Sequence, residues 1–247
     1  VKYDGLKNAY QGKENLIPLW VADMDFATPD FIVEALKKRC EHPVFGYTFD
    51  DDEYYESIQT WLDYKYHWKT EREWISYIPG IVKGIGLAVQ CFTQPGDKVI
   101  IQPPVYHPFR LVPTRMGREV VYNPLKLEDG VYKMDFEQLE SLIDKDCKML
   151  ILSNPHNPGG VVWEKEALVK LAQICSAHGI LVISDEIHAE MTYPQFRHHP
   201  FATVSEEAAA CSVTFMAPSK TFNIAGIVSS YALVPDSRIR EKFYSFL

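Results

Sequence analysis

A lysine stands at the end of a predicted buried strand, in the sequence APSKTFNIAG of residues 217–226. The residues before it, 212–217, are small or apolar, as expected for a strand in the core. Lysine is seldom buried without a partner, because removing water from its ammonium group is costly. A lysine amine held in such a place is a nucleophile towards carbonyl carbons. The position therefore predicts that Lys220 forms a Schiff base with a carbonyl ligand.

A carboxylate follows a second apolar run, in the sequence LVISDEIHAE of residues 181–190. Asp185 comes first after the run, so we expect it, more than Glu186, to be buried. A carboxylate at the end of a buried strand is costly unless a cation or a hydrogen-bond donor meets it. The sequence offers no local cation, whereas a protonated ring nitrogen of a bound cofactor would serve.

Three further strand ends carry groups that could bind a ligand, although each also has an ordinary structural explanation. After YIPG, the N–H groups of Ile81 and Val82 would open a helix and could bind a phosphate, but a simple strand–helix turn explains them as well. Tyr106, in QPPVYHPF, could stack on a planar ligand or cover the core. In LSNPHNPGG, a tight turn explains the prolines and glycines. It explains Asn157 less well, since an amide held there could donate to a ligand oxygen.

These strand ends together supply a phosphate site, a stacking ring, an amide donor, a carboxylate and a lysine. A carboxylate suits a pyridinium nitrogen, and a lysine suits an aldehyde. Pyridoxal 5′-phosphate (PLP) requires this set of groups from a protein. We therefore predict that the chain binds PLP.

Short apolar runs alternate with helical stretches along most of the chain. Several runs are apolar throughout, which is typical of strands in a sheet covered on both faces. The alternation predicts an α/β fold with a largely parallel sheet, in which ligands bind at the carboxyl ends of the strands. The predicted strands are 74–78, 97–102, 118–123, 148–153, 180–185, 212–217 and 227–234. The predicted helices between them are 80–92, 106–115, 135–143 and 164–177.

Two helices are predicted before the first strand. Thr28 is expected to cap the first of them, with Pro29 at the first helical position, where its missing N–H costs nothing. The second helix should run from Asp51 to about His67. The chain begins at Val1 and ends in an amphipathic helix without a cap, so we expect it to be a fragment of a longer polypeptide.

The composition argues against several classes of function. The chain has 247 residues, a net charge of −8 and no face rich in Lys and Arg, so neither nucleic acid nor an anionic membrane is an expected partner. No apolar run reaches the roughly 20 residues that span a bilayer, and no signal-peptide pattern precedes the first helix. The five cysteines are scattered, and His198 and His199 lack matching carboxylates, so we expect neither disulfides nor a metal site. These features predict a cytoplasmic protein.

The motifs PGIVK, PPVY, NPHNPGG, SDEIH and APSKTFNIAG occur in this order along the chain. Their order resembles that of the fold-type I PLP enzymes, the class I/II aspartate aminotransferase superfamily. Together with PLWVADMDFATP and FGYTF, they resemble most closely the cystathionine β-lyase and cystalysin-like C–S lyases, over essentially the whole chain. The resemblance implies a three-layer large domain with a mostly parallel sheet at residues 49–247. It implies an N-terminal arm and part of a small domain at residues 1–48, with the C-terminal small domain absent.

The resemblance also implies a role for each residue around the cofactor ring. Lys220 would hold PLP as the internal aldimine and later move the α-proton of the substrate. Asp185 would pair with the pyridine nitrogen and keep it protonated. Tyr106 would stack on the ring, and Asn157 would bond its phenolic oxygen.

The phosphate of PLP would be held by Ser219 and by the N–H groups of Ile81 and Val82. Tyr47, in FGYTF, matches a tyrosine that reaches the phosphate of the neighbouring subunit. The resemblance therefore implies a homodimer with shared active sites.

Two positions depart from the usual aminotransferase pattern. His188 stands three residues after the aspartate, where aminotransferases usually have a tyrosine, and we expect it to be one of the cofactor-binding residues. Val228 stands eight residues after the lysine, where they usually have an arginine that clamps the phosphate. Both departures suit the C–S lyase branch better. No residue of this chain matches the arginine that binds the substrate carboxylate in the family.

The resemblance implies α,β-elimination of L-cystathionine or a cysteine-type amino acid to a thiol, pyruvate and ammonia. An aminotransferase on the same scaffold is the alternative, and the two differ in whether a keto acid takes part. A non-catalytic regulatory or binding protein is a third hypothesis. The intact Lys220 and Asp185 argue against it.

Overall fold

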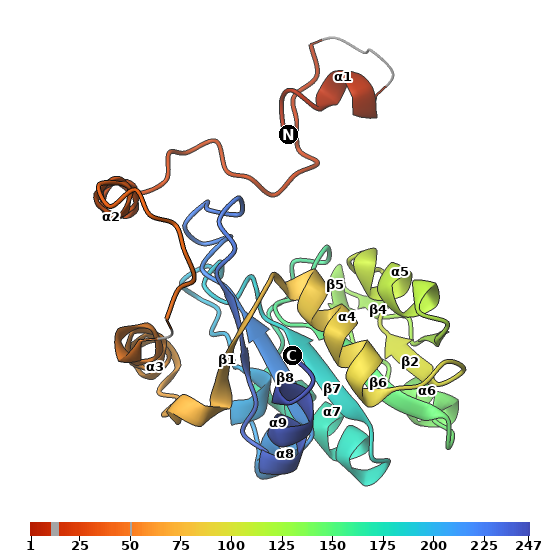
Figure 1. The fold of residues 1–247 in the computed structure, drawn as a ribbon. Helices are drawn as coiled ribbons and strands as arrows, with labels where there is room; N and C mark the ends of the chain where they lie inside the picture. The colour runs from red at the N-terminus through yellow and green to blue at the C-terminus, as the bar shows by residue number, and fades with distance from the viewer. Residues whose placement is uncertain (11–14, 50) are drawn as a thin grey trace. The chain divides into compact units, whose positions relative to one another are not determined.

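The structure is a computed structural model that describes residues 1–10, 15–49 and 51–247 (Figure 1). The chain divides into two compact units. Unit 1 comprises Val1–Thr48 and Pro218–Val228, and unit 2 comprises Phe49–Ala217 and Ser229–Leu247. Among these residues, no helix is both long enough and apolar enough to cross a membrane.

The described residues of unit 2 form a seven-stranded sheet in the order β1-β9-β8-β7-β6-β2-β3 (Figure 1). The five strands from β8 to β3 run parallel to their neighbours, whereas β9 is antiparallel to both β8 and β1. The prediction of an α/β fold with a mostly parallel sheet is confirmed. The strands are β1 Ile75–Ile78, β2 Lys98–Ile101, β3 Glu119–Tyr122, β6 Cys147–Ser153, β7 Leu181–Asp185, β8 Ser212–Met216 and β9 Ser230–Leu233.

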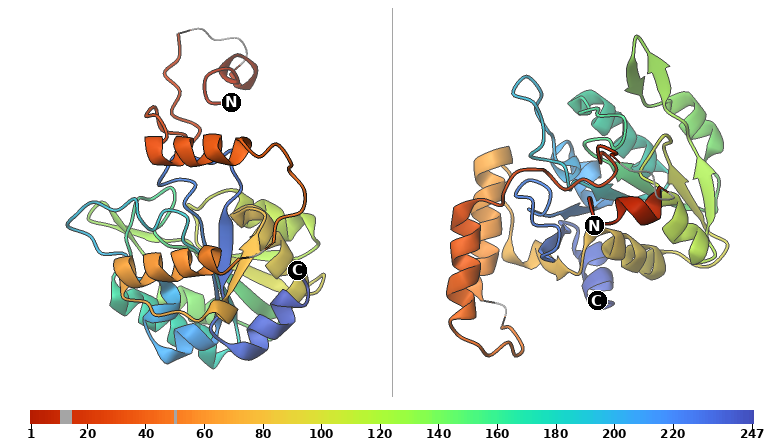
Figure 2. Two further views of the ribbon diagram at one scale, coloured as in Figure 1. Left: turned by 60° about the vertical axis from the view of Figure 1, so that its left-hand side comes forward. Right: turned by 90° about the horizontal axis from the view of Figure 1, so that it is seen from above.

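Helices cover both faces of this sheet and give unit 2 three layers, which can be followed in Figure 2. Alternation along β6 divides the core: Met149 and Ile151 face one layer, and Leu150 and Leu152 face the other. The first layer holds α4 Ile81–Phe92, α5 Pro108–Arg115 and α9 Ser237–Tyr244. The second holds α6 Phe136–Leu142, α7 Lys165–Ala177 and α8 Glu206–Ala210. The apolar runs of the sequence are therefore explained by burial on both faces.

The helix predicted from Asp51 to about His67 is α3, Asp52–Tyr66. It begins where the Asp51 side chain accepts the N–H of Tyr54, and it ends at His67, whose φ of 54° is left-handed. Its buried residues Ile58 and Leu62 pack in a third core cluster with residues of β1, β8 and β9. The short 3-10 helix η1, Arg72–Trp74, leads from α3 into β1.

Unit 1 joins the N-terminal segment to residues 218–228, which the sequence analysis assigned to the large domain. The side chain of Asn223 connects them: its Oδ1 accepts the N–H of Met24 at 3.0 Å, and its Nδ2 donates to the carbonyl oxygen of Phe26 at 2.8 Å. Near the chain start, Lys2 pairs with Asp25 at 3.0 Å. The helices of this unit are α1 Leu6–Ala9 and α2 Asp30–Cys40.

The predicted cap of the first helix is wrong. Pro29 occupies the N-cap position of α2, and among the described residues no side-chain hydrogen bond caps this helix. The hydroxyl of Thr28 instead donates to the carbonyl oxygen of Asn223 at 3.1 Å. A distant backbone group therefore takes the hydroxyl that the local pattern assigned to the helix.

Two features of the sheet region also differ from the prediction. β9 begins at Ser230, because Ile227 and Val228 are exposed and belong to unit 1. A hairpin of β4 Lys126–Glu128 and β5 Val131–Lys133 was not predicted. Its turn residues Asp129 and Gly130 have φ values of 50° and 80°, and Asp-Gly between alternating strands is the usual signal for such a turn.

Arg118 closes the C-terminal end of α4 against the sheet. Its Nε donates to the hydroxyl of Thr93 at 2.8 Å, and its Nη2 donates to the Thr93 carbonyl oxygen at 2.7 Å. Its Nη1 donates to the carbonyl oxygen of Met116. These bonds satisfy helix-end carbonyl groups that have no partner within the helix.

Replacing Arg118 should therefore destabilise the fold. We expect Arg118→Ala to lower the free energy of unfolding by about 2 kcal/mol, since hydrogen bonds from a charged donor are lost to carbonyl groups near a helix end. Urea denaturation followed by circular dichroism measures the change. Arg115→Ala is the matched control, because Arg115 is exposed on α5, and it should change stability by less than about 0.5 kcal/mol. Equal effects of the two variants would contradict this account of Arg118.

Candidate cofactor site

Asp185 is the last residue of β7, and its side chain is 7% exposed. Its Oδ1 accepts the N–H of Ile187 at 3.2 Å. Burial raises the pKa of the Asp185 carboxyl to about 7, against the opposing Ile187 hydrogen bond and with a further increase from the charge of Glu186. No Lys, Arg or His side chain within residues 1–10, 15–49 and 51–247 forms an ion pair with it. The carboxylate therefore suits a cationic ligand.

Glu186 is buried more deeply than Asp185, contrary to the expectation from the sequence. It is 1% exposed, and its Oε2 lies 2.7 Å from Nε2 of His198, which is itself buried. Its Oε1 accepts the hydroxyl of Ser184 and the N–H of Phe201, both at 2.8 Å. Burial of this carboxylate is possible because donors surround it. These donors could not be assigned from the local sequence, since His198 and Phe201 lie 12 and 15 residues away.

The topological switch point of the sheet lies between β2 and β6. The chain passes from β2 to β3 on one side and from β6 to β7 on the other, so the loops after β2 and β6 diverge. Tyr106 lies in the loop after β2, and Asn157 lies in the turn after β6. The N–H of Tyr106 donates to the carbonyl oxygen of Asn157 at 3.0 Å. Two of the predicted site residues are therefore joined through their main chains at the switch point.

The Tyr106 phenol lies close enough to Asp185 for the charge of this carboxylate to act on it. Burial raises the pKa of the Tyr106 phenol, and the nearby Asp185 carboxylate raises it further. The turn after β6 is also joined to the end of β7, because the N–H of Asn154 donates to the carbonyl oxygen of Asp185 at 3.0 Å. Asp185, Tyr106 and Asn157 thus lie at the carboxyl ends of three neighbouring strands.

The start of α4 has the geometry of an anion site. Gly80 occupies the N-cap position with a φ of 101°, and no side chain of the described residues caps this 12-residue helix. A Cβ at Gly80 would have no atom within 4 Å, so the space beside the helix start is open. The N–H groups of Ile81 and Val82 are therefore available to an anion.

The other predicted residue of unit 2 is His188, which is half-buried in the turn after β7. Its carbonyl oxygen accepts the N–H of Met191 at 2.9 Å. The structure describes no group of three or more His, Cys, Asp or Glu side chains that could hold a metal ion within residues 1–10, 15–49 and 51–247.

Tyr47, Ser219 and Lys220 belong to unit 1. Tyr47 is fully exposed, Ser219 is buried, and Lys220 is half-buried instead of lying in the core as expected. The carbonyl oxygen of Ser219 accepts the N–H of Ile224 at 2.9 Å, so the segment with the lysine forms a compact turn. The roles of these three residues stay predictions.

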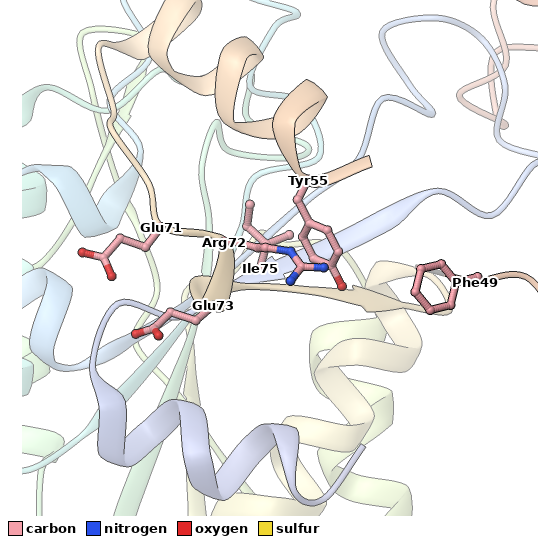
Figure 3. A pocket seen from close by; sticks show the side chains of 6 residues that line it. All are labelled: Phe49, Tyr55, Glu71, Arg72, Glu73 and Ile75. Atoms are coloured by element: carbon pink, nitrogen blue, oxygen red, sulfur yellow. The ribbon is translucent and has the colours of Figure 1, made fainter. Parts of the chain in front are cut away.

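A pocket elsewhere in unit 2 contains none of the predicted residues. It lies beside η1 and β1, and Figure 3 shows the Arg72 guanidinium against the ring of Tyr55, 4.4 Å from its centroid. Arg72 also pairs with Asp52 at 3.2 Å, and Glu73 pairs with Arg240 at 2.6 Å. Because Arg72 and Glu73 are already paired within the protein, these two side chains offer less to a charged ligand than Asp185 does.

The groups of unit 2 fit one part of PLP each. The Asp185 carboxylate, which has no cationic partner among the described residues, fits a protonated pyridine nitrogen. The half-buried Tyr106 ring fits an aromatic face, and the Asn157 amide fits an oxygen acceptor. The uncapped start of α4 fits a phosphate.

The chain is similar to known proteins in both sequence and structure. Residues 14–246 match the family model described as aminotransferase class I and II. The chain is 45% identical over its full length to the cystathionine beta-lyase PatB of Bacillus subtilis, of which it covers 64%. The structure of cystalysin from Treponema denticola, which contains PLP, superposes with a TM-score of 0.95 and 38% identity over 100% of this chain and 63% of that one. The PLP-bound C–S lyase of Staphylococcus hominis superposes with a TM-score of 0.90 and 32% identity, over 99% and 62% of the two chains. The chain therefore spans a little under two thirds of the length of these proteins.

Asp185 should make the stability of the cofactor-free protein depend on pH. Its folded-state pKa of about 7 lies above its usual value of 3.8, so between these values the folded chain holds a proton that the unfolded chain has lost. The stabilisation from this proton is complete below the usual pKa of 3.8 and is lost as pH rises through the folded-state pKa of about 7. Asp185→Asn should therefore be more stable than the wild type at about pH 8, by up to a few kcal/mol, and similar to it at about pH 4.

Urea unfolding across this pH range measures the effect. Asp129→Asn, at the exposed turn between β4 and β5, is the matched control and should keep the pH dependence of the wild type. An unchanged pH dependence in Asp185→Asn would show that Asp185 is not the buried titrating group.

Proposed function

The chain belongs to the class I and II aminotransferase family, and from this premise we propose that it is the larger part of a PLP-dependent carbon–sulfur β-lyase. The single observation that carries PLP binding is the buried Asp185 carboxylate, which has no cationic partner among the described residues. The lyase assignment is supported by the similarity to PatB and cystalysin. It is also supported by His188 and Val228, which depart from the usual aminotransferase pattern.

The residues of unit 2 would hold the cofactor and set its charge. When bound, PLP supplies an electron sink for negative charge that develops at the substrate Cα. Asp185 keeps a proton on the pyridine nitrogen by pairing with it. Tyr106 stacks on the ring, Asn157 donates to the phenolic oxygen, and the N–H groups of Ile81 and Val82 bind the phosphate.

The residues of unit 1 would attach the cofactor and move the proton. Nζ of Lys220 would hold the cofactor covalently, and the same amine, once free, would accept the proton from the substrate Cα. Ser219 donates to the phosphate, and Tyr47 reaches the phosphate of a neighbouring subunit in a homodimer. These roles are supported by the matching motifs and by the family.

The proposed substrates are L-cystathionine and cysteine-type amino acids. The Cα–H proton passes to Lys220, the Cβ–S bond breaks, and the thiolate leaves with the electron pair. Water then releases the remaining three-carbon unit as pyruvate and ammonia. The similarity to a cystathionine beta-lyase at 45% identity supports this substrate class.

The full-length protein loaded with PLP should release pyruvate and a thiol from L-cystathionine without any keto acid. Lys220→Ala should lose the visible absorption band of the lysine-bound cofactor and reduce kcat by about a hundredfold or more, since a positioned acid–base group contributes on the order of 10²–10⁴. Pyruvate is measured with a coupled dehydrogenase assay, and the thiol with a disulfide reagent.

Two results would contradict the proposal. Turnover that requires an added keto acid and forms no pyruvate from cystathionine would favour the aminotransferase alternative. Full activity in Lys220→Ala would remove the lysine from the mechanism. Lys148→Ala is the matched control, because Lys148 is an exposed lysine near the start of β6, away from the carboxyl ends of the strands, and should keep both the band and the activity.

A further inference from the structure

The main chain of Asn157 is held on both sides. Its N–H donates to the hydroxyl of Ser153 at 2.9 Å, and its carbonyl oxygen accepts the N–H of Tyr106 at 3.0 Å. In the described part of the chain, its side-chain amide has no hydrogen-bond partner. The backbone of Asn157 is thus fixed, while its side-chain amide is left for a ligand.

Ser153 is the last residue of β6 and is 6% exposed. Its hydroxyl accepts the Asn157 N–H and donates to the carbonyl oxygen of Pro155 at 3.1 Å. Its own carbonyl oxygen accepts the indole N–H of Trp163 at 2.9 Å. The hydroxyl of Ser153 therefore both donates and accepts a hydrogen bond within the turn.

His156 holds the opposite side of the same turn. Its ring is 4% exposed, and Nδ1 accepts the N–H of Gly159 at 3.2 Å. Burial lowers the pKa of His156 to about 4, so the ring is neutral near pH 7 and Nδ1 keeps its lone pair. A Cβ at Gly159 would lie 2.7 Å from Nδ1 and 2.8 Å from Cδ2 of Tyr132, which shows how closely the turn packs on the ring.

We propose that Ser153 and His156 are positioning residues that fix the turn 153–160 so that the Asn157 amide is presented to a ligand oxygen. The inference rests on the proposed function, because the oxygen is the phenolic oxygen of PLP. Neither residue touches the cofactor; each acts through Asn157. The Ser153 hydroxyl fixes the residue at its N–H, and the His156 ring fixes the turn that follows it.

The test is a pH titration of the visible absorption band of the PLP-loaded, full-length protein. A donor at the phenolic oxygen favours its anionic form and lowers the pH midpoint at which the bound cofactor loses its proton. Asn157→Ala should therefore raise the midpoint by about one pH unit, the shift that a lost hydrogen bond of ordinary strength gives. Ser153→Ala should raise it in the same direction by about half a unit or more.

The double variant separates positioning from general loosening of the fold. If Ser153 acts through Asn157, the midpoint of Ser153→Ala/Asn157→Ala should equal that of Asn157→Ala alone. Ser141→Ala is the matched control, because Ser141 is an exposed serine of α6 whose hydroxyl donates to the carbonyl oxygen of Gln138, and it should titrate as the wild type does. His156→Phe keeps a ring but removes the Nδ1 acceptor of the Gly159 N–H. If Ser153→Ala does not fold, His156→Phe takes its place in the same comparison with Asn157→Ala.

The outcomes are distinct from those that test the proposed function. Wild-type midpoints in Ser153→Ala and His156→Phe, alongside a raised midpoint in Asn157→Ala, would overturn the positioning role and leave the function standing. Additive shifts in the double variant would also overturn it. A wild-type protein that shows no visible band with PLP, or a band that persists in Lys220→Ala, would overturn the proposed function and this inference with it.

Discussion

The buried carboxylate of Asp185 is the constraint on which the candidate site depends. It ends β7 in the interior of the sheet, with β6 on one side and β8 on the other. One backbone N–H meets it, and burial raises its pKa to about 7. Near neutral pH the cofactor-free site is therefore poised between a neutral acid and an unpaired anion. A cationic ligand removes this cost, so binding and stability are linked through one side chain.

The neighbouring residue shows that this arrangement is not a general property of the strand end. Strand alternation directs Ile183 towards the α4 layer and Val182 towards the α7 layer. Ser184 and Glu186 lie on the same side as Val182. On that face, the Glu186 carboxylate receives donors from β7, from Asn154 and from the 198–201 segment. The same fold thus satisfies one buried carboxylate with its own donors and leaves the adjacent one to a ligand. The contrast is the physical argument for function at Asp185.

The strand ends could be predicted from sequence because each follows an uninterrupted apolar run, and Asp185, Tyr106 and Asn157 are polar groups placed just beyond such runs. Their mutual placement needs the strand order, which no local pattern contains. The same holds for contacts made across the sequence. The hydroxyl of Thr28 could not be assigned to Asn223, nor His198 to Glu186, because the partners are separated by 195 and 12 residues. The β4–β5 hairpin is different, since its Asp-Gly signal was present in the sequence and was overlooked.

The switch point explains why the turn after β6 carries its own clamps. Where the chain moves from strand to strand in one direction along a sheet, the loops lie beside each other and can share hydrogen bonds. At the switch point the loops after β2 and β6 instead diverge. The Tyr106–Asn157 bond joins them, Asn154 bonds to Asp185 and His199, and other polar groups of the turn find partners locally. Ser153, His156 and Trp163 supply those partners from within eleven residues of chain. The divergence that opens space for a ligand thus leaves at its edge a turn whose backbone is held by hydrogen bonds, and an amide on a held backbone loses less conformational entropy when a ligand binds it.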